Sequence, residues 1–313
     1  MKVGIYHLKH NRPAYSVLCE AFVGGMKKTG TEHQVIQSSS KGGHKPKNSF
    51  DLAVTFTNSP PRVAGVLEKQ KEDKNKYLTV YMGAFYKKGV VGTHNRNDIY
   101  GWDIKSKPKK DALFYFDLLY EDYTEHKFIG EDSDRIEKLN YFNLDIKPWK
   151  DDGKYILIPE QIKPEGMGHG ITDWTSWAKT KCSEIRDITD MPIKIRRHPN
   201  RFAWRKFKKE IKNDFTGIEL TDGTSLDEDL KDAHALVTLS SRCVVEAIIN
   251  GVHCFTEDLN SLAYAVCNKK LNLINYPQKF DRKKWLAKVA YSHWSVKELA
   301  SGDYFNHLKR SVS

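Results

Sequence analysis

The sequence has few cysteines, no long apolar run and no excess of acidic residues, and each absence excludes a class of protein. Five cysteines stand among 313 residues, without a Cys-x-x-Cys pair, which argues against a disulfide framework or a cysteine zinc site. No apolar run reaches about 18 residues, so we expect no membrane span. Residues 1–6 read as a strand and lack the features of a signal peptide. We therefore expect a cytoplasmic protein (the host cytoplasm if it is viral).

Positive charge is in excess instead, and it is unevenly spread. Lys and Arg number 51 against 40 Asp and Glu, a net charge of +11, which bears on the choice of partners rather than on the fold. Two loops are rich in lysine, and the densest basic stretch covers residues 194–212. The loop lysines that we expect to contact nucleic acid are Lys41, Lys45, Lys47, Lys105, Lys107, Lys109 and Lys110. A polyanionic partner fits this pattern, and so does a soluble protein with a lysine-rich surface.

The chain length and the order of the expected elements indicate two α/β domains. A chain of 313 residues fits two domains of about 150 residues each. Strands and helices alternate over residues 2–82, and the alternation restarts at 155 after a polar linker at 149–153. This order is typical of parallel sheets with helices on their faces. We predict two doubly wound, Rossmann-like domains, 1–150 and 151–280, facing a central cleft, followed by C-terminal helices at 281–313.

Periodicity and capping residues place the individual elements. Gly251 should close the helix before it, and Ser225 and either Thr172 or Asp173 should begin helices. Expected strands lie near 2–6, 35–37, 51–57, 77–82, 155–158, 192–196, 217–220, 235–239 and 252–255. Expected helices lie near 13–30, 62–71, 171–186, 202–212, 225–232, 244–250 and 281–310.

Ser240 and Ser241 stand between a buried strand and the helix that follows it. Backbone N–H groups and the helix dipole at such a turn favour an anion, although the two serines could equally be plain N-caps. Glu246 is the only charge on that helix, and a carboxylate in apolar surroundings needs a partner. A ribose diol would supply one, and a nearby arginine such as Arg242 is the alternative.

Further candidates follow the other strands of the second domain. Arg196 and His198 come at the end of the strand near 192–196, and guanidinium groups suit phosphates. Gln161 follows the first strand of this domain, and Gly168 lies in a glycine-rich loop before the next helix, where a bare backbone can approach an anion closely. A basic surface turn and an ordinary loop are the alternatives.

Taken together, residues 155–265 resemble the C-terminal half of capsule-polysaccharide-type glycosyltransferases, which have the GT-B fold. The matching segments are an Arg-x-His-Pro element at 196–199 after Ile193, Ser225-Leu226, Asp232-Ala233, the Ser240-Ser241 turn with Glu246-Ala247, Gly251 and Phe255, and a Pro-x-Gln element at 159–161. The resemblance implies that His198, Ser240, Ser241 and Glu246 bind a nucleotide-sugar donor, UDP- or CMP-linked. It also implies that neither a metal nor another cofactor is required. Residues 285–302 resemble the tails of bacteriophage-encoded proteins of this type.

The first domain should supply the general base, because it faces the acceptor in this fold. A carboxylate or imidazole within reach of the acceptor hydroxyl is needed. The candidates in loops after strands are His7, His10, His94, Asp98 and Asp103. His94 and Asp98 rank first, because their segment also gathers Gly, Asn, Arg and Trp.

Three functions remain open for the acceptor side. The first is sugar transfer onto a hydroxymethylated pyrimidine, such as hydroxymethylcytosine, in double-stranded phage DNA, held electrostatically with the base flipped out. The second is transfer onto a capsular or lipid-linked glycan. The third is a non-catalytic GT-B-like protein that binds nucleic acid. We expect a monomer in each case.

Overall fold

The computed structural model divides into two compact units. Unit 1 comprises Met1–Lys138 and Ala287–Ser313, and unit 2 comprises Leu139–Leu286. The described residues are 1–8, 13–38, 44–55, 60–82, 115–120, 135–136, 145–161, 173–198, 218–221, 225–259 and 261–312. Among them, no helix has the length and apolar character needed to cross a bilayer.

Unit 1 is built on a six-stranded sheet with the order β11-β5-β4-β3-β1-β2. The neighbours β2, β1, β3 and β4 run parallel, whereas β5 is antiparallel to β4 and β11 is antiparallel to β5. The strands are β1 (Lys2–Leu8), β2 (Glu32–Ser38), β3 (Leu52–Thr55), β4 (Lys76–Met82), β5 (Tyr115–Tyr120) and β11 (His293–Ser295). The helices are α1 (Pro13–Lys28), α2 (Pro60–Glu72), α10 (Val296–Ser301) and α11 (Asp303–Val312).

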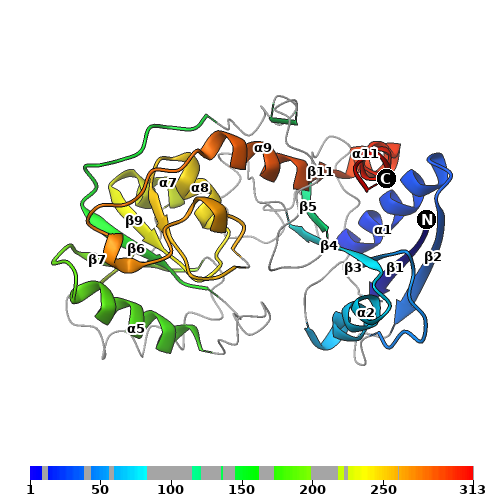
Figure 1. Ribbon diagram of the computed structural model, residues 1–313, viewed down its shortest axis with the longest axis horizontal. Helices are drawn as coiled ribbons and strands as arrows, with labels where there is room; N and C mark the ends of the chain where they lie inside the picture. The colour runs from blue at the N-terminus through cyan, green and yellow to red at the C-terminus, as the bar shows by residue number, and fades with distance from the viewer. Residues whose placement is uncertain are drawn as a thin grey trace. The chain divides into compact units, whose positions relative to one another are not determined.

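Helices cover both faces of this sheet (Figure 1). On one face, Phe22 of α1 and Phe305 of α11 pack with Val3, Ile5 and neighbouring strand residues in a dry core. On the other face, α2 packs against the sheet in a smaller cluster that includes Val66, Ala53 and Tyr77. The central strand β3 is buried at every position, because both faces of the sheet are covered.

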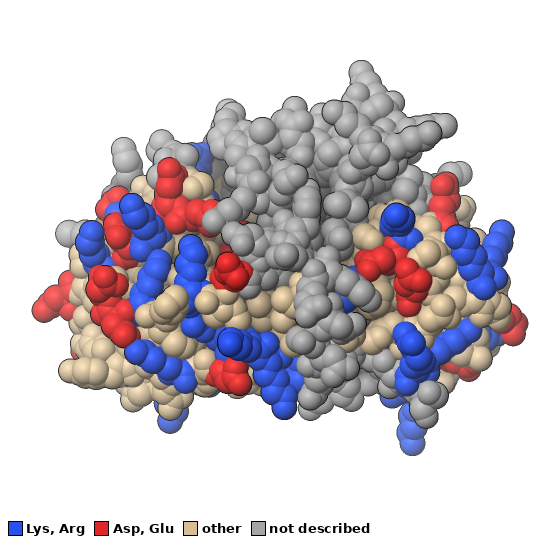
Figure 2. All heavy atoms as spheres, turned by 90° about the horizontal axis from the view of Figure 1, so that it is seen from above, with Lys and Arg blue, Asp and Glu red and all other residues tan. Residues whose placement is uncertain are grey.

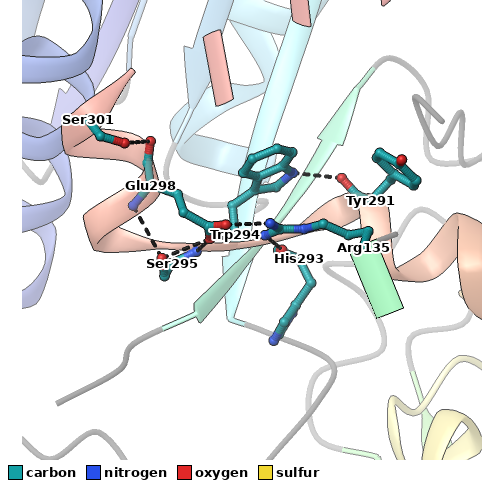
Figure 3. Close-up of polar contacts among 7 residues, drawn as sticks. All are labelled: Arg135, Tyr291, His293, Trp294, Ser295, Glu298 and Ser301. Atoms are coloured by element: carbon teal, nitrogen blue, oxygen red, sulfur yellow. Dashed lines mark hydrogen bonds and ion pairs between the residues drawn. The ribbon is translucent and has the colours of Figure 1, made fainter. Parts of the chain in front are cut away.

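The C-terminal segment belongs to unit 1, where Arg135 binds it (Figure 3). The Arg135 guanidinium lies over the Trp294 ring, 3.9 Å from the centroid. It pairs with the Glu298 carboxylate and donates to the carbonyl oxygen of His293. Arg135 is only 2% exposed, so its charge is neutralised inside the fold. Residues far apart in sequence are thereby joined at the edge strand β11.

Unit 2 is built on a five-stranded, wholly parallel sheet with the order β10-β9-β6-β7-β8. Its strands are β6 (Tyr155–Pro159), β7 (Ile193–Arg196), β8 (Ile218–Thr221), β9 (Ala233–Val237) and β10 (His253–Phe255). Its helices are α5 (Trp174–Arg186), α7 (Leu226–Lys231), α8 (Cys243–Ile249) and the short turns η3 (Tyr264–Val266) and η4 (Leu271–Leu273). The helix α9 (Arg282–Ser292) spans the boundary between the two units.

The helices of unit 2 also cover both faces of its sheet. Figure 1 shows α5 on one side and α7 and α8 on the other. Trp174 and Ile185 of α5 pack with Ile156, Ile193 and Val237 in one core cluster. The neighbouring strand positions point to the face where α7 and α8 lie, because side chains alternate along a strand.

Most elements predicted from the sequence are present, and their caps explain their bounds. Asp173 begins α5 by accepting from the backbone N–H of Thr175 and Ser176. Ser225 begins α7 in a capping box with Glu228. Gly251 follows α8 with φ of 79°, a backbone conformation that favours glycine. Two strands were missed: β5, and β11 within the tail that was predicted to be helical. The predicted basic helix near 202–212 lies outside the described residues.

Candidate functional site

The carboxyl edge of the unit 2 sheet brings together candidates from three separate strands. The sheet order places β6, the first strand of this unit along the chain, beside β9, the fourth strand. The chain therefore runs from β6 toward β7 and β8 on one side of this pair and from β9 toward β10 on the other. Ligands of open α/β sheets bind at such a switch point, beyond the carboxyl ends of the strands. Gln161 follows β6, Ser240 follows β9, and Arg196 and His198 come at the end of β7.

Gln161 and Ser240 bind each other directly at this switch point. The Gln161 side-chain amide donates to Ser240 Oγ at 2.7 Å, and the Ser240 backbone N–H donates to Gln161 Oε1 at 3.0 Å. The two hydrogen bonds fix the carboxamide across the β9–α8 turn. Both residues were predicted as donor ligands from separate motifs, and the fold places them in contact.

Ser240 and Ser241 are not the side-chain caps of α8. The N-cap residue is Arg242, and no side-chain hydrogen bond caps the helix there. The Ser241 backbone N–H donates to Thr238 Oγ1 at 3.2 Å, and Ser241 Oγ lies 3.1 Å from Cys243 Sγ. The backbone N–H groups of both serines are therefore already hydrogen-bonded. An anion that binds these two groups must replace existing contacts.

Arg196 is held by a carboxylate that the sequence analysis did not single out. Its guanidinium pairs with Asp229 of α7, and Asp229 also accepts from Thr221 Oγ1 at 3.2 Å. Asp229 is 4% exposed, so this pair is largely removed from water. Arg196 is thus both a strand-end cation and half of a buried ion pair.

His198 is neutral at pH 7. Burial lowers the pKa of its imidazole to about 4, and the positive charge of Arg196 adds to the shift. Its backbone N–H donates to the Glu160 carboxylate at 2.9 Å. The neutral ring carries one N–H donor and one acceptor, so it offers a ligand hydrogen bonding rather than positive charge.

Glu246 titrates near neutrality. Burial and, to a smaller extent, the negative charge of Asp227 raise the pKa of its carboxyl, and the positive charge of Arg196 lowers it. The net result is a pKa of about 7. Arg196, at the end of β7, is an arginine whose charge acts on Glu246. Cys243 lies in the same group, and burial raises the pKa of its thiol to about 12, so the thiol is not a nucleophile at pH 7.

Two site residues missed by the sequence analysis are Glu160 and Asp229. Each is a buried carboxylate, 6% and 4% exposed respectively, and each holds a strand-end residue in place. Glu160 could have been noticed as the charge directly after an all-apolar strand. Asp229 closes an Asp-x-Asp sequence with Asp227, but its carboxylate pairs with Arg196. Across the described part of the chain, no cluster of His, Cys, Asp and Glu could hold a metal ion.

Several predicted site residues fall elsewhere. The catalytic candidates His94 and Asp98 and the donor candidate Gly168 lie outside the described residues. So do five of the predicted nucleic-acid contacts: Lys41, Lys105, Lys107, Lys109 and Lys110. Lys45 and Lys47 are described, and both are exposed in unit 1. Among the open base candidates, His7 is buried at the end of β1, where burial lowers the pKa of its imidazole.

On the face seen in Figure 2, the described residues do not form separate patches of positive and negative charge. Lys and Arg side chains alternate there with Asp and Glu over both ends of the view. Ion pairs among the described residues include Lys69 of α2 with Asp73 at 2.9 Å and Lys194 of β7 with Glu219 at 2.9 Å. The net positive charge therefore does not form a single basic patch among the described residues of that face.

Neither a protein-family model nor a curated protein matches the sequence. Among solved structures, the β-Kdo 2,4-transferase of Thermosulfurimonas dismutans KpsC is similar, with a TM-score of 0.52 and 12% identity over 93% of this chain and 89% of that one. The β-Kdo 2,7-transferase of the same KpsC gives 0.48 and 11% over 98% and 99%. A UDP-GlcNAc 2-epimerase from Neisseria meningitidis gives 0.34 and 12% over 99% and 100%.

The chain has a GT-B-like fold. The first of these similarities, together with the two parallel sheets and their covering helices, confirms the fold class predicted from the sequence. The TM-score of 0.52 indicates a shared architecture, and at 12% identity the function must be argued from the site.

Proposed function

We propose that this protein is a glycosyltransferase that takes a sugar from a UDP- or CMP-linked donor, bound at the carboxyl edge of unit 2. The observation that carries the proposal is the contact between Gln161 and Ser240 at the switch point of a parallel sheet, with Arg196 at the end of the adjoining strand β7 and its charge acting on Glu246. This is the place where open α/β sheets bind nucleotides. The resemblance of residues 155–265 to capsule-type transferases supports the same assignment.

The residues have distinct roles in donor binding. Arg196 would offer a guanidinium to the donor phosphates, which accept paired N–H donors well. Ser240 and Ser241 would bind a phosphate oxygen at the β9–α8 turn after it displaces the Gln161 carboxamide. Glu246 would accept from the ribose hydroxyls. Because its pKa is about 7, Glu246 is partly protonated at neutral pH and repels the adjacent phosphates less than a full charge would.

Catalysis would then need a base and a stabilised leaving group. We propose Asp98 or His94 as the general base that takes the proton of the acceptor hydroxyl. Departure of the nucleotide would be stabilised electrostatically by Arg196 and the hydroxyl-rich turn. No metal is required in this scheme.

For the acceptor we propose a hydroxymethylated pyrimidine in double-stranded DNA, in a bacteriophage setting. The support is charge alone: the net +11 and the exposed Lys45 and Lys47, with the other loop lysines. A second candidate is a glycan acceptor, favoured by the similarity to a Kdo transferase of the KpsC type. The two differ in salt dependence, since phosphate contacts to DNA release counterions on binding.

Donor binding is tested by thermal-shift titration with UDP-, CMP- and GDP-sugars. A donor present at about 100 times its Kd should stabilise the protein by roughly 2.7 kcal/mol. Glu246→Ala should weaken binding by about tenfold. Glu219→Ala, which removes a carboxylate from β8 outside the proposed site, should not weaken binding. No stabilisation by any nucleotide sugar would instead support a non-catalytic protein.

Acceptor choice is tested by mass spectrometry of nucleosides from hydroxymethylcytosine DNA incubated with protein and donor. A glycosylated nucleoside that disappears with Asp98→Asn or His94→Asn supports the DNA assignment and the base. Absence of both DNA modification and low-salt DNA binding, with transfer onto a capsular oligosaccharide, would support the glycan alternative.

A further inference from the structure

Asp229 is a buried carboxylate that three strands and one helix hold in a fixed position. It accepts from the Arg196 guanidinium and from Thr221 Oγ1. Its own carbonyl oxygen accepts from the Tyr155 hydroxyl at 2.6 Å. The capping box of Ser225 fixes the first turn of α7, on which Asp229 lies. The carboxylate therefore has little freedom to move, and neither does any group bound to it.

The position of Asp229 determines where the Arg196 guanidinium lies. Arg196 and Thr221 are direct cross-strand partners at the carboxyl ends of β7 and β8, so both meet Asp229 at the sheet edge. The guanidinium also acts electrostatically on His198 and Glu246, which places it on the side of the edge where the donor site is proposed. An arginine has several N–H donors in a rigid fork, so binding one side orients the whole group.

We propose that Asp229, assisted by Thr221, is a positioning residue that holds the Arg196 guanidinium ready to bind the donor phosphates. This inference rests on the proposed function. A flexible arginine would lose rotamer freedom when it binds phosphate, and ordering it in advance removes that cost from the binding step. Asp229 acts through Arg196 and does not itself touch the donor.

The same two strands carry a matched control. Two positions earlier on each strand, Lys194 of β7 binds Glu219 of β8 at 2.9 Å, with the Glu219 side chain 63% exposed. Lys194 lies on the same strand and the same sheet face as Arg196, because side chains alternate along a strand, and its pair has the same charge types as Arg196 and Asp229. It lies away from the carboxyl edge and is open to water, so its loss should be nearly silent.

The experiment measures the affinity for UDP and CMP and the NMR signals of labelled arginine side chains in four proteins: wild type, Asp229→Asn, Thr221→Val and Glu219→Gln. The Arg196 Nε–H signal is assigned from its loss in Arg196→Lys. Asp229→Asn should weaken nucleotide binding by about tenfold or more, and Thr221→Val by about threefold. Both variants should shift or broaden the Arg196 signal, whereas Glu219→Gln should match the wild type. In turnover, the loss should appear in KM for the donor more than in kcat.

Nucleotide affinity in Asp229→Asn and Thr221→Val equal to that in Glu219→Gln, with the wild type binding normally, would overturn this inference and leave the proposed function standing. If the wild type binds neither UDP nor CMP and no added nucleotide moves its Arg196 signal, the proposed function and this inference both fail. Thr221→Val keeps the test decisive if Asp229→Asn does not fold, because it removes one hydrogen bond and no charge.

Discussion

Replacing Glu246 with Gln should stabilise the protein relative to wild type, and this gain should be larger at alkaline pH than at acid pH. In the folded chain the carboxyl has its pKa raised from 4.5 to about 7 by burial and by Asp227. Below about pH 4.5 the group is protonated in both the folded and the unfolded chain, so its titration costs nothing. As the pH rises, the unfolded chain releases the proton first, and folding becomes progressively less favourable until the folded pKa is passed.

The size of this effect follows from the shift. One pKa unit corresponds to about 1.4 kcal/mol, so the full shift amounts to roughly 3 kcal/mol at pH 8. Gln cannot ionise and escapes this penalty. The difference in unfolding free energy, Glu246→Gln minus wild type, should thus rise between pH 4.5 and 7 and stay level above that range.

Urea unfolding followed by tryptophan fluorescence, at half-unit steps from pH 4.5 to 8.5, measures that difference. Glu219→Gln, on the exposed part of β8, is the control, and its difference curve should vary by less than about 1 kcal/mol. A flat Glu246→Gln curve, or one that falls as the pH rises, would refute the reasoning that burial keeps this carboxyl protonated.

Three further predictions concern other parts of the chain. His198→Gln should give the opposite pH dependence, because the pKa of His198 is about 4 in the folded chain against 6.5 in the unfolded chain. The variant should gain stability relative to wild type as the pH falls, by roughly 2–3 kcal/mol at pH 4.5 in urea unfolding. No gain on acidification would contradict this prediction. Arg135→Met leaves the partly buried Glu298 carboxylate of α10 without its cation. The variant should lose about 3 kcal/mol of unfolding free energy in the same measurement. A loss no larger than that of a surface ion pair would show that the contact is dispensable. Gly25→Ala should lower the melting temperature, because a Cβ there would lie 1.9 Å from the Leu299 carbonyl oxygen, at a cost of at least about 2 kcal/mol. Gly24→Ala is the matched control, because a Cβ there would lie 3.8 Å from the Ala300 carbonyl oxygen. This variant should be neutral or slightly stabilising.

Local signals in the sequence were sufficient for most of the fold. Short apolar runs mark most of the parallel strands, and capping residues such as Asp173 and Ser225 mark the helix starts where they occur. The edge strand β11 was missed because His293–Ser295 stands between two helical segments, and only its pairing with β5 makes it a strand. β5 itself, Tyr115–Tyr120, is antiparallel in an otherwise parallel run, so the expected alternation with helices does not reveal it.

The candidate site was predictable in its members but not in its connections. Gln161 and Ser240 are 79 positions apart, and their contact depends on β6 and β9 being neighbours, which follows from strand order rather than from either motif. The same holds for Asp229, whose helix could have lain over any strand. The pKa of His198 depends on how deeply the ring is buried, and a motif carries no information about burial.

The contacts at this edge differ in whether a ligand can replace them. The Gln161 carboxamide binds Ser240 through two neutral hydrogen bonds on a half-exposed side chain, and a phosphate oxygen can take over those donors with stronger, charge-assisted bonds. Asp229 is buried and shared between Arg196 and Thr221, and displacing it would leave a carboxylate without a cation in apolar surroundings. Binding should therefore proceed by exchange at Gln161 while the Asp229 contact persists, so that donor affinity reflects the difference between the new bonds and those they replace.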